Sequence, residues 1–204
     1  ADPADLIAVD ALTSVAVNAS NVETLTGSVS NLNSYRTAFD AGTISGLTVY
    51  SVVTNDTSAA ASDLLTLADT SPLDPDTNLA SIGTITGSTT QIQTLYGLQS
   101  GGAQQVSGLG NEVIVLNDTG SVAATTLTTV AALTTDGNVS ASNAIAISGT
   151  AAEVTAALVT DTTNVVASLA TVAISDSGSI ASTVLASIAA KTSGTVTASN
   201  ITEI

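Results

Sequence analysis

The chain has no cysteine, histidine, methionine or tryptophan, and its aromatic residues are three Tyr and one Phe in 204 residues. Without cysteine it can form neither a disulfide nor a thiolate metal site. Without histidine or cysteine it also lacks the commonest general base and the thiol nucleophile of enzymes. No Asp or Glu stands apart from the pattern that recurs along the chain. The sequence therefore predicts a protein that is not an enzyme.

Basic residues are almost absent. Arg36 and Lys191 stand against 17 Asp and Glu, so the formal net charge is −15. Phosphate binding needs clusters of basic side chains, which excludes nucleic acid and attraction to an anionic membrane. No apolar run approaches the roughly 20 residues of a membrane span, so no membrane insertion is expected. The start, Ala1–Asp5, has no basic region of a signal peptide, so we expect a mature, processed or excised chain.

Apolar residues make up 44% of the chain and charged residues only 9%, so Ala, Val, Leu and Ile must form nearly all of the core. Small aliphatic side chains suit thin layers that stack at a fixed spacing. Two basic residues also give trypsin-like proteases only two cleavage points. This composition favours an extracellular or cell-surface protein.

Two families of short segments alternate along the chain. The first comprises Ala19–Ser28, Leu79–Ser88, Ala141–Thr150 and the truncated Ala198–Ile204, and the second comprises Tyr50–Thr57, Val113–Thr119 and Val172–Ser177. Self-similarity at a fixed period is typical of a stacked array. We expect one array over 1–204, with repeats at 19–78, 79–140 and 141–197 and partial repeats at 1–18 and 198–204.

One residue marks each half of the repeat. The markers alternate between glycine and aspartate at 27 to 31 residue intervals: Gly27, Asp56, Gly87, Asp118, Gly149 and Asp176. That interval holds one strand and one helix, as in a leucine-rich-repeat coil. The predicted fold class is α/β. The predicted architecture is a solenoid of six or seven strand-plus-short-helix coils with a parallel sheet, in double repeats of about 60 residues.

Local patterns agree with this architecture. Short strands rich in β-branched residues are expected at 22–26, 47–54, 82–86, 112–116, 144–148 and 172–175. Apolar residues at helical spacing follow the turns, as in Val154, Ala157 and Leu158, or Ile180, Val184 and Ile188. Thr150 and Glu153 have the spacing of a capping box. The segment Leu6–Asn21 aligns with Leu185–Asn200, and no polar capping repeat is apparent, so we expect either a piece of a longer array or ends that stack on other copies.

The segments Ser107–Glu112, Leu116–Thr119 and Ser148–Glu153 resemble the tandem modules of very long bacterial extracellular surface proteins, notably of marine cyanobacteria. The resemblance covers most of the chain. It implies a secreted protein associated with the cell surface, adhesion or motility, with calcium-binding stretches in many members. The glycine- and aspartate-rich nonapeptide of calcium β-rolls is absent from this chain.

Asp56, Asp118 and Asp176 recur at the expected strand-to-helix turns. The favoured hypothesis is helix capping, in which each carboxylate accepts a hydrogen bond from a helix-end N–H. The alternative is a ladder of calcium ligands, because calcium prefers carboxylate and carbonyl oxygens. A second candidate calcium site is the acidic loop with Asp69, Asp74 and Asp76, for which a solvated loop is the favoured interpretation. No other cofactor is indicated.

Five Asn residues fit the N-glycosylation sequon, namely Asn18, Asn55, Asn117, Asn138 and Asn200. In a chain rich in Ser and Thr, composition alone can produce such matches. For Asn55 and Asn117, which coincide with the expected helix-start turn, a structural role is the favoured interpretation.

The sequence predicts a structural repeat module of an extracellular fibre, stalk or surface layer, which assembles by stacking of coils. Its expected partners are further copies end to end, or neighbouring repeats of a longer chain. The alternative hypothesis is a calcium-dependent adhesin or surface-binding module.

Overall fold

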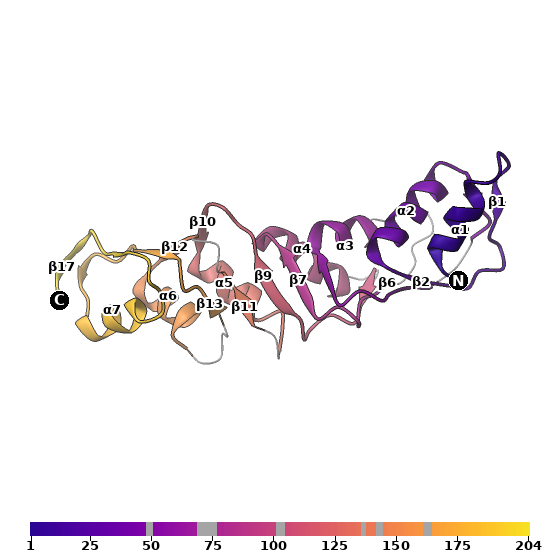
Figure 1. Cartoon of the computed structure of the whole chain (residues 1–204). Coiled ribbons are helices and arrows are strands. Elements are labelled where there is room, and N and C mark those ends of the chain that lie inside the picture. Colours follow the sequence, from indigo (N-terminus) through magenta and orange to yellow (C-terminus); the bar gives the residue numbers. More distant parts are fainter. Residues whose placement is uncertain (48–50, 69–76, 101–104, 136–137, 142–144, 161–164) are drawn as a thin grey trace. The chain divides into compact units, whose positions relative to one another are not determined.

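The computed structural model describes residues 1–47, 51–68, 77–100, 105–135, 138–141, 145–160 and 165–204 (Figure 1). Within these ranges the chain forms seven short helices. They are α1 (Pro3–Asp10), α2 (Val29–Asp40), α3 (Ala61–Ala68), α4 (Thr89–Ser100), α5 (Ala124–Ala131), α6 (Ala151–Leu158) and α7 (Ser182–Ala189).

The longest strands have four residues and form two sets. Three end at a glycine and are named here the glycine strands: β2 (Thr24–Gly27), β7 (Thr84–Gly87) and β12 (Ala146–Gly149). Three are followed by Asn-Asp or Ser-Asp and are named the aspartate strands: β4 (Ser51–Thr54), β9 (Val113–Leu116) and β14 (Thr171–Ile174).

The other strands have two or three residues. They are β1 (Val17–Asn18), β3 (Ile44–Ser45), β5 (Ser58–Ala60), β6 (Thr77–Asn78), β8 (Val106–Ser107), β10 (Ser121–Ala123), β11 (Val139–Ser140), β13 (Val165–Val166), β15 (Gly178–Ser179), β16 (Val196–Thr197) and β17 (Ile201–Glu203).

The described chain divides into two compact units, one of residues 1–85 and 94–109 and the other of residues 86–93 and 110–204. In the first unit, β2, β4, β6 and β8 form a sheet in that order, and β1 pairs with β3. All of these pairings are parallel, and each joins residues 25 to 29 positions apart. Helices α1, α2 and α3 contact each other in chain order beside this sheet (Figure 1).

The second unit follows the same rule. Strands β10, β12, β14 and β16 form one sheet in that order, β9, β11 and β13 lie in another, and β15 pairs with β17. Their pairings are again parallel and join residues 23 to 26 positions apart. Helices α5, α6 and α7 also contact each other in chain order. In both units each strand therefore pairs in parallel with a strand 23 to 29 residues away in the chain, which is compatible with a coiled parallel-sheet arrangement.

Side chains alternate between the two faces of each strand, and those that face inward form the core. Leu25, Ile85 and Ile147 occupy the same place in the three glycine strands, and each has no exposed surface. Their strand neighbours point outward and are small, such as the exposed Thr24 and Thr26. Buried aliphatic residues from the helices, such as Leu32 and Leu64 in the first unit, cover the inward side. Burial of these side chains is the main stabilising contribution.

Glycine is required where two turns lie directly against each other. Gly46 has φ +93°, and a Cβ there would lie 2.6 Å from Asn18 Oδ1. Gly108 has φ +86°, and a Cβ there would lie 2.7 Å from the backbone nitrogen of Ala80. Asn18 and Asn78 shape the two neighbouring turns, because their Oδ1 atoms accept hydrogen bonds from Ser20 N and Ala80 N. Only a residue without a side chain fits this contact.

The expected α/β class and parallel pairing agree with this arrangement. Each of the six expected strands overlaps an observed four-residue strand, and the capping box of Thr150 and Glu153 is present. One expectation is wrong in detail, because Ile180 precedes α7 rather than forming part of it. The single-array boundaries remain a prediction.

We expect Gly108→Ala to lower the free energy of unfolding by at least about 2 kcal/mol, because it combines a strained positive φ with a clash against the Ala80 backbone. Equilibrium urea unfolding measures this. Gly120→Ala is the matched control, since a Cβ there meets nothing within 4 Å. Its expected change is within about 0.5 kcal/mol. Equal losses in the two variants would contradict the turn-contact argument.

Candidate functional site

Each glycine strand runs directly into a helix whose first turn is capped locally. The hydroxyl of Ser28 accepts a hydrogen bond from Asn31 N (3.2 Å), and that of Ser88 accepts one from Gln91 N (3.2 Å). Thr150 accepts one from Glu153 N (3.3 Å), and Glu153 Oε2 accepts one in return from Thr150 N (2.8 Å). The first N–H of each helix is not served by these local bonds.

That first N–H is taken by an aspartate from far along the chain. Val29 N donates to Asp56 Oδ2 (2.6 Å), Thr89 N donates to Asp118 Oδ2 (2.9 Å), and Ala151 N donates to Asp176 Oδ2 (2.5 Å). The two residues of each bond are 27, 29 and 25 positions apart in the sequence, about the same separation as between residues of paired strands. The three aspartates singled out from the sequence therefore all lie at helix N-termini, and in each case the helix is the preceding one.

This differs from the sequence-based expectation, in which the aspartate lies at the start of the helix that follows it. The chain continues as β5, β10 or β15 after each aspartate, so the next helix begins only five or six residues later. The residues at the N-caps of α5 and α7 are Ala123 and Ala181, and neither makes a side-chain cap bond. Among the described hydrogen bonds, each carboxylate thus contacts the helix that precedes it in the chain and not the helix that follows it.

The Asp118 contact has a second bond. Thr89 Oγ1 donates to Asp118 Oδ1 (3.0 Å), and Thr89 is only 7% exposed. Loss of this carboxylate would remove a partner from a buried hydroxyl as well as from a helix-end N–H, and leaving such a group unsatisfied costs about 1–3 kcal/mol. A carboxylate at this position also interacts favourably with the positive end of the helix dipole.

Metal binding at these positions remains a prediction. Across the described ranges, no group of three or more Asp and Glu side chains could hold a metal ion. The described contacts of Asp56, Asp118 and Asp176 are hydrogen bonds to protein donors. The acidic loop residues Asp69, Asp74 and Asp76 lie outside the described residues.

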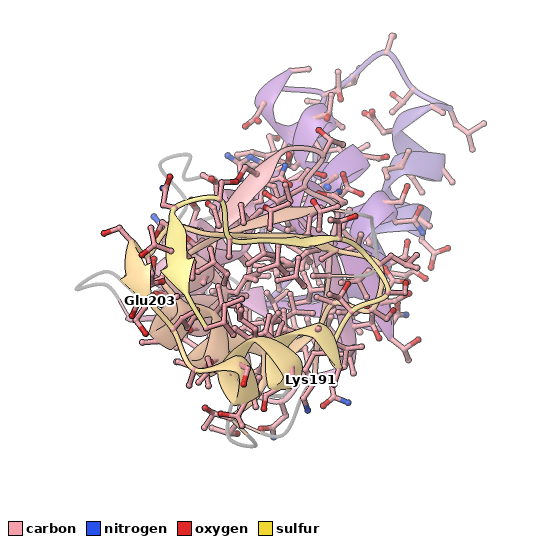
Figure 2. The ribbon with its side chains drawn as sticks, turned by 90° about the vertical axis from the view of Figure 1, so that its left-hand side faces the viewer. Lys191 and Glu203 are labelled. Carbon is pink, nitrogen blue, oxygen red and sulfur yellow. The ribbon has the colours of Figure 1, made fainter. Side chains whose placement is uncertain are left out.

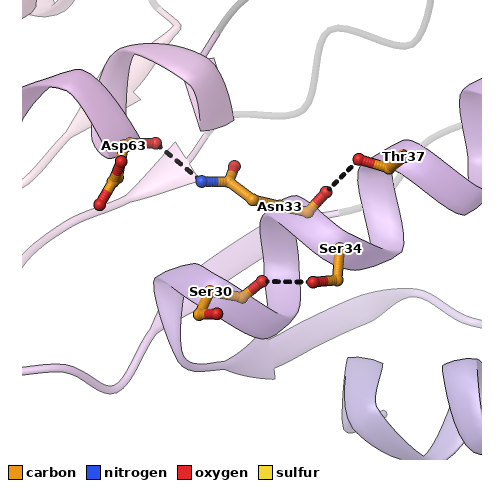
Figure 3. A pocket seen from close by; sticks show the side chains of 5 residues that line it. All are labelled: Ser30, Asn33, Ser34, Thr37 and Asp63. Carbon is orange, nitrogen blue, oxygen red and sulfur yellow. Dashed lines mark hydrogen bonds between the residues drawn. The ribbon is translucent and has the colours of Figure 1, made fainter.

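A polar hollow of about 300 Å³ lies beside α2 and α3 in the first unit and is lined by Ser30, Asn33, Ser34, Thr37 and Asp63 (Figure 3). Its polar atoms are mostly paired within the helices. Ser34 and Thr37 donate to backbone carbonyls one turn earlier, and Asn33 Nδ2 donates to the Asp63 carbonyl (3.0 Å). The Asn33–Asp63 bond joins α2 to α3. Among the side chains that line this hollow, only the Asn33 Oδ1 atom is buried without a partner.

A larger groove of about 580 Å³ lies along α5 and α6 in the second unit, lined by Thr125, Thr128, Thr129, Ala132, Leu133, Glu153 and Ala156. Thr128 and Thr129 donate their hydroxyls to carbonyls of their own helix, which leaves their methyl groups to contribute to the groove lining. Glu153 takes part in the capping box. The described hydroxyl bonds of the residues that line the two hollows all go to backbone carbonyls.

One carboxylate that the sequence did not single out is buried. Glu112 is 2% exposed, and its Oε2 accepts a hydrogen bond from Gly110 N (2.8 Å). Its own carbonyl accepts a bond from Thr134 Oγ1 (3.0 Å). The pair of glycines around Leu109 is the only sequence signal that marks this turn as unusual. Because Glu112 accepts these bonds with its side chain and its carbonyl, we interpret it as a structural contact between neighbouring segments.

Ion pairing contributes little to the described part of the chain. Within the described residues the one salt bridge joins Arg36 Nε to Asp40 Oδ2 (3.1 Å) on α2. Figure 2 shows Lys191 beside the end of α7 and Glu203 on β17. A search of the described helices finds none with the length and apolar character to cross a membrane.

The chain matches no protein-family model, no curated protein and no solved structure in the comparisons made. Its function must therefore be argued from its own geometry, in which the aspartate contacts recur three times.

We expect Asp118→Ala to lower the free energy of unfolding by about 1–3 kcal/mol, because the N–H and the hydroxyl of Thr89 both lose their partner. Asp176→Ala should cost less, about 1 kcal/mol, since it removes a single cap bond. Native-state hydrogen exchange should show faster exchange at Thr89 in the first variant, although the mutated residue lies beyond α4 in the sequence.

Asp63→Ala is the control, because the Asp63 side chain is exposed and its only described bond is a weak one from Ser62 Oγ (3.4 Å). It should leave exchange in α2 and α4 unchanged. Faster exchange in α5 rather than α4 after Asp118→Ala would mean that the carboxylate serves the helix that follows it.

Proposed function

We propose that this chain is a non-enzymatic structural module of an extracellular fibre, stalk or surface layer, built as a solenoid of strand-plus-helix coils in double repeats of about 60 residues. The observation that carries the proposal is the recurrence of one aspartate contact at Val29, Thr89 and Ala151, at the same place in each proposed repeat. A contact that returns with the sequence period is what a stacked array requires.

Backbone hydrogen bonds support the same period. The N–H groups of Asn55, Asn117 and Ser175 donate to the carbonyls of Gly27, Gly87 and Gly149, which end the three glycine strands. A second set is formed by Ala19 N to Ser45 O, Leu79 N to Ser107 O, and Ala141 N to Val166 O. Each set recurs once in each proposed double repeat, so the two halves of the repeat are paired in the same register in all three copies.

The surface chemistry fits a role in assembly rather than catalysis. On the sheet of β10, β12, β14 and β16, the outward residues are small and uncharged, as in Ser121, Ala146 and Thr171, which are paired across neighbouring strands. Large apolar side chains are exposed near α1, where Leu12 is 88% and Val15 is 74% exposed. The proposed mode of assembly is end-to-end stacking of coils, in which such apolar surface becomes buried, and the partners are further copies or neighbouring repeats of a longer chain.

Solution scattering of the chain over a concentration series, without calcium, tests the proposal. We expect a rod of constant cross-section that lengthens with concentration, because stacking adds units along one axis. Leu12→Asn should reduce this growth, since it removes an apolar side chain that is 88% exposed, and the helix content should stay unchanged. Ser187→Ala, in α7, is a control that should leave growth unaffected.

A particle that stays single at every concentration would contradict self-assembly. If calcium then raises the melting temperature of the wild-type chain but not of Asp118→Ala, the alternative hypothesis of a calcium-dependent adhesin is the better one. In the structural-module proposal, Asp118→Ala lowers the melting temperature by the same amount with and without calcium.

A further inference from the structure

The asparagines of the sequons are all accessible. Exposed side chains are found at each of the five positions, Asn18, Asn55, Asn117, Asn138 and Asn200. The described asparagines outside sequons are mixed: Asn21 and Asn111 are exposed, whereas Asn31, Asn33 and Asn78 are partly buried. Composition can create the motif, but it does not require that every copy falls on an accessible asparagine.

Two of the five sequons differ from the others because neither the Asn carboxamide nor the hydroxyl two positions later is engaged in a described hydrogen bond. Among the described contacts, the carboxamides of Asn55 and Asn117 make no hydrogen bond, and neither do the hydroxyls of Thr57 and Thr119 two positions later. All four residues are exposed. By contrast, Asn18 Oδ1 accepts from Ser20 N, and the Thr202 hydroxyl, two positions after Asn200, donates to the Gly178 carbonyl.

The backbone around these two residues is held firmly while their side chains point outward. Asn55 N and Asn117 N donate to the carbonyls of Gly27 and Gly87, so each residue extends the parallel ladder by one bond. The preceding residue is buried, with Thr54 at 2% and Leu116 at 0% exposure. The following aspartate turns inward to the helix. A large group on the asparagine would therefore project into solvent without displacing the core.

We propose that Asn55 and Asn117 are acceptor sites for N-linked glycans. In this reaction a bond forms between Asn Nδ2 and the anomeric carbon of an oligosaccharide. The bond from that carbon to a polyprenyl pyrophosphate carrier breaks, the carrier leaves with the electron pair, and Nδ2 loses one proton. The hydroxyl of Thr57 or Thr119 completes the sequon that the transferring enzyme recognises. The proposal rests on the proposed extracellular role, because such transfer occurs on chains that are exported.

The chain isolated from the cells that make it provides the direct test. Digestion should use a protease that cleaves at acidic residues, because Arg36 and Lys191 leave trypsin one peptide that spans both sites. Enzymatic release of N-glycans in heavy-oxygen water converts each glycan-bearing Asn to labelled Asp. We expect label at positions 55 and 117. A chain whose mass equals that of its sequence, or label confined to Asn18, Asn138 or Asn200, would overturn the proposal.

The chain supplies a matched gain-of-site control. Ser175 occupies the place of Asn55 and Asn117, is exposed, and is followed by Asp176 and Ser177. Translation of the chain behind a secretion leader in the presence of microsomes should add one glycan for each of Asn55 and Asn117. Ser175→Asn should add one more, and Thr57→Ala should remove one, with unchanged circular dichroism in both variants.

Failure of Asn55 and Asn117 to be modified, while an established acceptor protein is modified in the same microsomes, would overturn the proposal. This outcome is separate from the scattering result. A chain that polymerises without glycans would contradict only the glycosylation, and a glycosylated chain that stays single would contradict only self-assembly.

Discussion

The hydrogen bond from the first N–H of a helix to a carboxylate at the end of the next aspartate strand is the contact on which the arrangement of the layers depends. The backbone hydrogen bonds of the parallel sheets join one strand to another, but they do not join a strand to a helix. Short helices rich in Ala and Thr have little stability alone. The carboxylates of Asp56, Asp118 and Asp176 join the end of an aspartate strand to the helix before it, so each of these three strands is held in register with that helix.

This contact also shows how carboxylates are accommodated in a chain with few basic residues. With a net charge of −15 and two basic residues, ion pairing can neutralise few carboxylates. Several acidic side chains instead accept hydrogen bonds from backbone N–H groups, as Asp56, Glu112 and Glu153 do. Helix N-termini carry a partial positive charge, which favours carboxylates without a cationic side chain. Hydroxyls of Ser and Thr in the helices bond to carbonyls one turn earlier, as those of Thr66 and Ser187 do.

The four-residue strands and the capping box could be predicted from the sequence, because β-branched runs and the Thr150–Glu153 spacing are local signals. The two-residue strands could not, since a pair such as Thr77–Asn78 has no period to detect. Helix α2 has no clear local signal either, because Asn31–Arg36 departs from the small aliphatic pattern of the other segments. The candidate site shows the same limit. The recurrence of Asp56, Asp118 and Asp176 identifies residues with a common role, but which helix they serve depends on the register between distant segments, and no local pattern contains that information.

Successive residues of the tripeptides Asn55–Thr57 and Asn117–Thr119 face opposite sides at a strand end, so the proposed glycan acceptor and the capping aspartate lie side by side without interfering. The Asn side chain is exposed and its carboxamide makes no hydrogen bond among the described contacts, the Asp carboxylate accepts a bond from the preceding helix, and the Thr side chain is again exposed. The direction of the aspartate bond has a further consequence for folding. Helices α2, α4 and α6 gain their last cap only when the chain has continued through the next strand, so a segment is completed by its successor. In the proposed one-dimensional array, each unit is therefore stabilised by contact with its neighbour.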